Sequence, residues 1–449
     1  MRMDFHTTTF PGNKKAVTLQ HLQAQADDGT ENAVVNLYPQ KRYQQWEGFG
    51  GAFTESAGYI FSLLTKAQQE QLIDAYYGTD GLGYTLGRIH IDSCDFSLAH
   101  FQAINDPADR EMKSFSLDAA EKYQLPLLRA TQERIGRKIP LMAAPWSPPD
   151  FMKTNKERNH GGKLLAQCYD FWADYLCKYL LALDEKGFEV RCMTVQNEPK
   201  AVQTWDSCIY TAHEEKEFLR DFLYPALQKH GLTNIALYLW DHNKERVFDR
   251  VHDSLDETVA HLVAGVAFHW YSGDHFEALQ MLREDFPHLR FAQTEACIEY
   301  RTFDKNDYLK NAQRYAHDLI GDCNAGMSAF YDWNLLLDQE GGPNHVGNYC
   351  DAPFLFHTKT GLLEERNSYA YIGHFSRYIK PDALRIGASC YTSALAATAF
   401  QNPDGTIAAV LLNETDAALP VVLRINGQMV KTNAPAASIS TAVLHTKEA

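Results

Sequence analysis

Features that direct a chain to a membrane, a metal or a nucleic acid are missing from these 449 residues. No apolar run exceeds the length of a strand, so we expect no membrane-spanning segment. Nine cysteines form no C-x-x-C pair and no zinc-ligand spacing, so the sequence predicts no metal and no other cofactor. A net charge of −15 argues against nucleic acid and anionic membranes as partners, because both require basic patches.

The cysteines and the first residues also bear on the compartment. Nine is an odd number, and free thiols in a reducing compartment are its simplest explanation. The segment Met1–His6 lacks the apolar core of a secretory signal. We therefore expect a cytoplasmic protein, with signal-independent export as the alternative.

Short apolar runs alternate with longer amphipathic stretches through the middle of the chain. Eight such runs occur, and parallel strands joined by crossover helices are the structure that produces this order. The sequence therefore predicts a (β/α)₈ barrel. The runs are Gly48–Phe53, Thr85–Ile91, Ile139–Trp146, Val190–Gln196, Ile235–Trp240, Val263–Tyr271, Leu289–Thr294 and Met327–Trp333.

Five of the intervening stretches are predicted helices. In the first, Thr65 and Gln68 have the spacing of a capping box. The five are Thr65–Tyr77, Leu117–Arg134, Leu164–Lys186, Glu214–Gln228 and His275–Phe286.

Both ends of the chain differ from the middle. After Ile386, strand-like segments alternate with Pro, Asn and Gly turns, as in an antiparallel sheet, and Val34–Tyr38 is also strand-like. We predict a β-sandwich built from both termini, with residues 1–45 and 381–449 flanking a barrel of residues 46–380. The C-terminal strand segments are Ser393–Phe400, Thr406–Asn413, Pro420–Ile425 and Ser438–His445.

Two glutamates stand at the ends of predicted strands. Glu198 lies in the frame Gln-Asn-Glu-Pro, and Glu295 lies in the frame Thr-Glu-Ala-Cys. Residues at the C-terminal tips of barrel strands converge on one face, and two facing carboxyls are the basic requirement for cleaving a glycosidic bond. The pair therefore favours a glycoside hydrolase.

The two carboxyls can be given separate roles. We assign Glu198 as acid/base, with a pKa raised by burial and a neighbouring negative charge, and Glu295 as nucleophile. Arg88, at another strand tip, could keep Glu295 ionised, and Asn197 could bond a sugar 2-hydroxyl. A retaining mechanism requires the carboxyls about 5–5.5 Å apart.

Structural interpretations compete with these roles. Arg88 could form a purely structural ion pair, and His269 could be a hydrogen-bonded core histidine. Trp146 and Trp333 favour stacking on sugar over core packing because they end strands. Cys297 is interpreted as a buried thiol, since nothing basic nearby would lower its pKa. A binding module for carbohydrate or lipid is the non-enzymatic alternative, although it has no need of paired carboxyls.

A set of frames in fixed order resembles glycoside hydrolase family 30, in particular its glucosylceramidase-like members. The resemblance spans residues 48 to 387. Its frames are Gly48–Thr54, Ser93–Ser97, Ala144–Pro149, Gln196–Pro199, His269–Tyr271, Thr294–Cys297, Asp332–Leu335, Glu340–Asn344 and Gly373–Ile379.

The resemblance implies a retaining β-glycosidase acting on a glucosyl lipid or an oligosaccharide, with Glu198 as acid/base and Glu295 as nucleophile. β-Xylosidase, β-fucosidase and β-1,6-glucanase are the alternatives with the same chemistry. The chain departs from the glucosylceramidase frame at His345, where an aromatic is expected, and in the loops 200–208 and 240–246. By the same resemblance the sugar site is lined by Arg88, Asp95, Trp146, Asn197, His269, Tyr271, Trp333 and Asn348.

Overall fold

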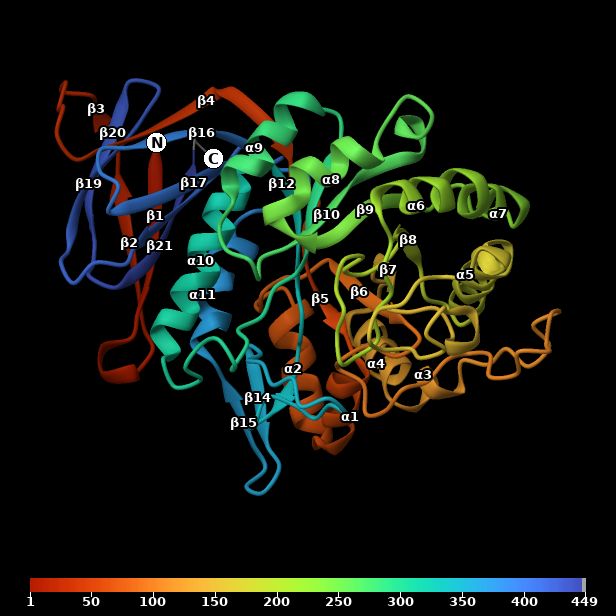
Figure 1. The fold of residues 1–449 in the computed structure, drawn as a ribbon. Coiled ribbons are helices and arrows are strands. Elements are labelled where there is room, and N and C mark those ends of the chain that lie inside the picture. Colours follow the sequence, from red (N-terminus) through yellow and green to blue (C-terminus); the bar gives the residue numbers. More distant parts are fainter. Residues whose placement is uncertain (446–449) are drawn as a thin grey trace.

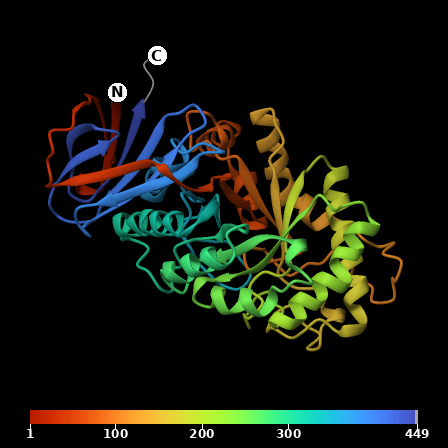
Figure 2. The ribbon, with the colours of Figure 1, turned by 90° about the horizontal axis from the view of Figure 1, so that it is seen from above.

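The computed structural model describes residues 1–445, which form a barrel and a β-sheet domain side by side (Figures 1 and 2). The sheet domain contains the first and last strands of the described chain, and the barrel occupies the middle of the sequence. This is the fold class that the sequence predicts. The exact domain boundaries at residues 45 and 380 stay a prediction.

Eight parallel strands close the barrel, each hydrogen-bonded to two neighbours. Every predicted apolar run overlaps one of them, so all eight predictions are confirmed. The strands are β5 (Gly48–Phe53), β6 (Leu86–Ile91), β7 (Leu141–Pro145), β8 (Val190–Thr194), β9 (Ala236–Asn243), β10 (Val263–His269), β11 (Arg290–Glu295) and β12 (Met327–Asp332).

Helices follow the strands and surround the barrel (Figure 1). The capping box at Thr65 and Gln68 is present, whereas the predicted helix 214–228 is divided by a π-helical turn at Phe218–Leu223. The helices are α1 (Glu55–Leu63), α2 (Lys66–Tyr77), α3 (Asp118–Lys122), α4 (Gln124–Ile135), α5 (Tyr169–Glu185), α6 (Ala212–Glu217), α7 (Tyr224–Lys229), α8 (Val247–Ser254), α9 (Phe276–Asp285), α10 (Tyr308–Ala325) and α11 (Asn367–Ser376).

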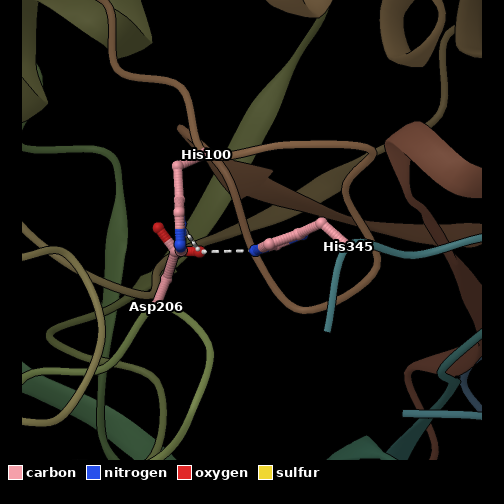
Figure 3. A group of neighbouring side chains, drawn as sticks. All are labelled: His100, Asp206 and His345. Carbon is pink, nitrogen blue, oxygen red and sulfur yellow. Dashed lines mark hydrogen bonds and ion pairs between the residues drawn. The ribbon is translucent and has the colours of Figure 1, made fainter. Parts of the chain in front are cut away.

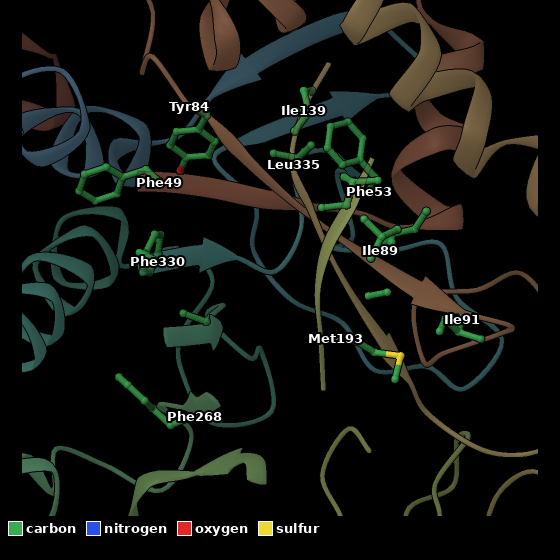
Figure 4. Packing of buried hydrophobic residues seen from close by; sticks show 14 of the residues in the cluster. Phe49, Phe53, Tyr84, Ile89, Ile91, Ile139, Met193, Phe268, Phe330 and Leu335 are labelled. Carbon is green, nitrogen blue, oxygen red and sulfur yellow. The ribbon is translucent and has the colours of Figure 1, made fainter. Parts of the chain in front are cut away.

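Alternate residues of the barrel strands belong to two different cores, because successive side chains of a strand point to opposite faces. Phe268 and Phe330 join the large cluster between strands and helices, part of which Figure 4 shows. Ala267, Ala329 and Tyr331 join a smaller cluster of inward-facing side chains. The strands are thereby buried on both faces, which explains why each one is a continuous apolar run in the sequence.

The sheet domain contains ten strands that surround a separate apolar core. Its pairs are antiparallel, apart from β4 with β19. Strands from both ends of the chain meet here, as predicted. They are β1 (Arg2–Thr9), β2 (Ala16–Gln23), β3 (Gln25–Ala26), β4 (Val34–Gln45), β16 (Leu384–Cys390), β17 (Leu395–Gln401), β18 (Ile407–Asn413), β19 (Leu419–Ile425), β20 (Gln428–Ala434) and β21 (Ser438–His445).

A three-stranded sheet follows the last barrel strand. Its strands are β13 (Leu337–Asp338), β14 (Phe354–His357) and β15 (Leu362–Glu365). Within residues 1–445, no helix combines the length and the apolarity needed to cross a bilayer.

His374 of α11 joins the barrel to the sheet domain. Its Nε2 lies 2.8 Å from Oγ1 of Thr8 on β1, and its Nδ1 lies 2.9 Å from Oγ1 of Thr441 on β21. Burial lowers the pKa of His374 to about 3, so the ring is neutral and can donate to one hydroxyl while accepting from the other.

Replacing His374 with alanine should therefore destabilise the fold. Two buried hydrogen bonds are lost and two hydroxyls lose a partner, which together cost about 2–4 kcal/mol. Urea unfolding followed by circular dichroism should show a lower midpoint for His374→Ala. The exposed His21 is the control, and an equal loss in His21→Ala would contradict a specific role for His374.

Candidate active site

The tips of the barrel strands enclose a small cavity of about 110 Å³. Eight of the ten predicted site residues line it, whereas Arg88 and His269 are fully buried beneath its wall and do not line it. The eight are Asp95, Trp146, Asn197, Glu198, Tyr271, Glu295, Trp333 and Asn348.

Arg88 of β6, buried under the cavity wall, holds three polar residues of the site together. Its Nη1 donates to Oε2 of Glu295 at 2.6 Å, and its Nη2 donates to Oδ1 of Asn197 at 2.9 Å and to Oδ2 of Asp241 at 2.9 Å. Opposed charges outweigh the effect of burial and raise the pKa of Arg88. The guanidinium is therefore a permanent cation fixed between two acids, so the ion pair predicted with Glu295 is present.

Asp241, at the end of β9, anchors this arrangement. Its carboxylate accepts from Oγ1 of Thr194 at 2.6 Å and lies 3.0 Å from Nε2 of His269. Burial would raise the pKa of Asp241, but Arg88 and His269 together hold it below its ordinary value. Asp241 is consequently an ionised, fully buried partner for both cations.

Glu295 is held by both of its oxygens. Oε2 accepts from Arg88, and Oε1 accepts from the hydroxyl of Tyr271 at 3.0 Å. Burial raises the pKa of Glu295, while His269 and Arg88 oppose the rise. The orientation of this carboxylate is fixed from two sides before any substrate enters.

Glu198 faces two imidazoles. Its Oε1 lies 3.4 Å from Nδ1 of His269 and 3.5 Å from Nδ1 of His242. Burial raises the pKa of Glu198, but the two histidines outweigh burial and lower it. The sequence-based expectation of a raised pKa for Glu198 is therefore wrong, because that expectation did not include the histidines.

Left-handed backbone marks the same region. The φ angles are 47° at Glu198, 76° at Trp240 and 53° at Asp241, none of them a glycine. Such conformations cost free energy and persist where the surrounding structure imposes them, as it often does at functional sites. The amide N–H of Glu198 donates to the carbonyl of Asp241 at 2.9 Å, which connects two of these positions.

Trp146 and Trp333 both line the cavity and also stack on each other. Their ring centroids are 5.2 Å apart, and the planes differ by 15°. The guanidinium carbon of Arg88 lies 4.8 Å from the centroid of Trp146 and 5.4 Å from that of Trp333. The indoles thus serve core packing as well as the cavity wall, and their stacking on a sugar stays a prediction.

Asp95 and Asn348 form a polar pair on the cavity wall. The amide of Asn348 donates to Oδ2 of Asp95 at 3.2 Å. Burial, with the negative charges of Glu295 and Glu198, raises the pKa of Asp95 well above its usual range. A protonated Asp95 can both donate and accept a hydrogen bond, which suits a sugar hydroxyl.

Several lining residues were missed by the sequence analysis. His242 follows Asp241 at the end of a predicted strand, so the strand-tip rule could have found it. Asn243 ends the same strand, and the others lie on loops, where no periodicity places a side chain. The missed set comprises Gln203, Trp205, His242, Asn243, Glu299 and Cys350.

A second, larger cleft of about 500 Å³ adjoins the cavity. Tyr271 and Glu299 line both spaces. Trp270 and Phe303 give the cleft aromatic walls, and Arg314 adds a charged group. A molecule bound in the cavity can therefore extend into a cleft that is part aromatic and part charged.

All nine cysteines are unpaired. Cys297 is buried, and burial raises the pKa of its thiol well above the usual range. Two groups of side chains within residues 1–445 have the composition and spacing of metal ligands. One is Glu198 with His242 and His269, inside the cavity wall, and the other is His100 with Asp206 and His345.

The charge of His269 should make stability depend on pH. Burial disfavours the imidazolium, but the carboxylates of Glu295, Asp241 and Glu198 raise its pKa from 6.5 to about 9. Because the folded pKa is the higher one, this stabilisation is complete below about pH 6.5 and is lost as pH rises through about 9. Its size is about 3 kcal/mol.

Urea titrations of wild type and His269→Gln at several pH values test this. The difference in unfolding free energy should shrink between pH 6.5 and pH 9. A difference independent of pH would contradict a charged His269.

Comparison with known proteins gives consistent matches. Residues 46–379 match the glycosyl hydrolase family 30 TIM-barrel domain, and residues 382–442 match the family's β-sandwich domain. The chain is 31% identical over 404 residues to putative glucosylceramidase 4 of Caenorhabditis elegans, covering 86% of this chain and 78% of that protein.

Two solved structures are similar along the whole chain. SrfJ from Salmonella typhimurium is 34% identical with a TM-score of 0.96, and the endo-β1,6-glucanase BT3312 is 25% identical with a TM-score of 0.89. Each alignment covers 100% of both chains.

Proposed function

The chain belongs to glycosyl hydrolase family 30, and on this basis we propose that it is an exo-acting β-glucosidase in which Glu295 is the nucleophile and Glu198 the acid/base. As a member of this family it is a retaining β-glycosidase. The observation that carries the assignment is the double anchorage of Glu295 by Arg88 and Tyr271. A nucleophile must be ionised and aimed, and this carboxylate has a cation at one oxygen and a phenol at the other.

In the first step, a carboxylate oxygen of Glu295 attacks the anomeric carbon. The glycosidic bond breaks, and Glu198 gives its proton to the departing oxygen. In the second step, Glu198 takes a proton from water, whose oxygen displaces Glu295 from the sugar. Arg88 and Tyr271 stabilise the carboxylate when it leaves.

Glu198 requires a proton at the start of this cycle. His269, whose pKa is raised to about 9, lies with Nδ1 3.4 Å from Glu198 and Nε2 4.0 Å from Glu295. The imidazolium is thus a proton store in contact with the acid. Neutralisation of Glu295 in the glycosyl-enzyme weakens the hold on that proton, since Glu295 is a main source of the raised pKa.

The cavity volume supports attack on a single terminal sugar. About 110 Å³ is far below the roughly 300–1,000 Å³ of pockets for drug-sized ligands. Asn197 is fixed by Arg88 beside the cavity and can bond the 2-hydroxyl, an interaction that strengthens in the transition state.

For the leaving group we propose a lipid-linked glucoside such as glucosylceramide, as the name of the C. elegans relative suggests. Two exposed apolar side chains adjoin cavity-lining residues in sequence: Val202 precedes Gln203, and Tyr349 follows Asn348. An apolar surface at the mouth is what a lipid would need.

A β-1,6-linked glucan is the second candidate. Glu299 lines both the cavity and the cleft, and Arg314 lies in the same cleft. Carboxylate and guanidinium groups bond sugar hydroxyls well and suit an alkyl chain poorly.

Hydrolysis assays distinguish these substrates. Wild type should hydrolyse 4-methylumbelliferyl β-glucoside and fluorescent glucosylceramide, and Glu295→Gln should lose roughly 10⁴-fold or more of both activities, as enzymes do on losing a nucleophile. Turnover of β-1,6-linked glucose oligomers but not of glucosylceramide would favour the second candidate. No turnover of any β-glucoside by wild type would contradict the proposal.

A further inference from the structure

Three side chains from distant parts of the sequence meet outside the sugar cavity. His100 follows β6, Asp206 follows β8, and His345 follows β12. Figure 3 shows the two imidazoles approaching the carboxylate of Asp206 from different sides. His100 Nδ1 lies 3.0 Å and His345 Nε2 lies 4.0 Å from Oδ2 of Asp206.

The hydrogen bond made by Nδ1 of His345 sets which of its ring nitrogens carries a hydrogen. Nδ1 lies 2.8 Å from the carbonyl oxygen of Ser97, which can only accept, so Nδ1 carries the hydrogen. With the hydrogen on Nδ1, the imidazole presents the lone pair of Nε2 on its other side. That lone pair faces a carboxylate oxygen, and Nε2 is buried without a hydrogen-bond partner among the described residues.

Two acceptors facing each other need a cation or a proton donor between them. We propose that His100, Asp206 and His345 bind a divalent transition-metal ion, with Zn²⁺ as the natural representative. Two imidazoles and one carboxylate are typical ligands for such an ion, and unlike an all-oxygen set they do not favour Ca²⁺ or Mg²⁺.

The spacing of the ligand atoms fits this ion. Tetrahedral zinc with bonds of about 2.0–2.1 Å separates its ligands by roughly 3.3 Å. The observed 3.0 and 4.0 Å lie on either side of that value, so small side-chain rotations suffice. His100 is 39% exposed, which leaves an approach for the ion and a position for water.

The groups around the cluster orient it for binding. Metal-bound histidines usually donate their second N–H to a carbonyl or carboxylate, as His345 does to Ser97. Oδ1 of Asp206 accepts from Oγ of Ser93 at 2.8 Å and from Nε of Arg158 at 2.5 Å, which turns Oδ2 toward the imidazoles.

Arg158 is shared between two buried acids. Its Nε bonds Asp206, and its Nη1 lies 3.6 Å from Oδ2 of Asp92, so neither carboxylate has this cation to itself.

The site joins two segments for which the sequence analysis expects a departure from the glucosylceramidase frame. They are His345 and the loop 200–208, which contains Asp206. Trp205, next to Asp206, lines the sugar cavity, and so does Asn348, three residues after His345. A bound ion would fasten together loops that follow three different barrel strands.

Zinc binding by the full chain tests the proposal. After removal of metal with a chelator, titration calorimetry with Zn²⁺ should give one strong site per chain. His100→Gln and His345→Gln should each weaken it more than about a hundredfold, beyond the 10–100-fold expected when only an orienting hydrogen bond is lost. Zn²⁺ should also raise the melting temperature of wild type but not of the two variants.

His252→Gln is a matched control. His252 is 41% exposed and lies 2.9 Å from Asp285, so it matches His100 in exposure and in its contact with a carboxylate, although Asp285 is itself exposed and no third ligand joins the pair within residues 1–445. It should bind zinc as wild type does. The proposal would be overturned if wild type showed no saturable binding, or if both His100→Gln and His345→Gln bound zinc as tightly as wild type. Unchanged binding in both variants would place the ion at Glu198, His242 and His269 instead.

Discussion

The site depends on one buried cation. Arg88 contacts Glu295, Asn197 and Asp241 with its two terminal nitrogens and lies close to both cavity indoles. A charge buried this deeply is tolerated only when it is paired and hydrogen-bonded, and Arg88 has two acids for that purpose. Removing it would take the principal counter-charge from Asp241 and a directly bonded cation from Glu295, so fold and chemistry depend on the same residue.

Because Arg88 bonds Glu295 and not Glu198, the two carboxyls have different surroundings. Glu295 sits against a guanidinium and a phenol, which offer fixed donors, whereas Glu198 sits against two imidazoles, which can exchange protons. A nucleophile benefits from the first setting and an acid/base from the second. The difference between the partners, more than the resting pKa of either acid, supports the assignment of roles.

Much of this arrangement was predictable from the sequence. Buried parallel strands are continuous apolar runs, so all eight barrel strands could be located, and their ends pointed to Glu198 and Glu295. Two kinds of feature could not be predicted from the sequence. Trp205 and Glu299 lie on loops without periodicity, and the depth of Arg88 and His269 depends on packing. The metal-like cluster was invisible for a related reason, because His100, Asp206 and His345 share no spacing.

The stereochemistry of azide rescue tests the central assignment most directly. Glu295→Gly and Glu198→Gly would each be assayed on an activated β-glucoside with azide, and the product identified by NMR. If Glu295 is the nucleophile, azide enters the face it vacated, so Glu295→Gly should yield α-glucosyl azide and Glu198→Gly should yield β-glucosyl azide. The reverse pair of products would show that the roles of the two glutamates are exchanged.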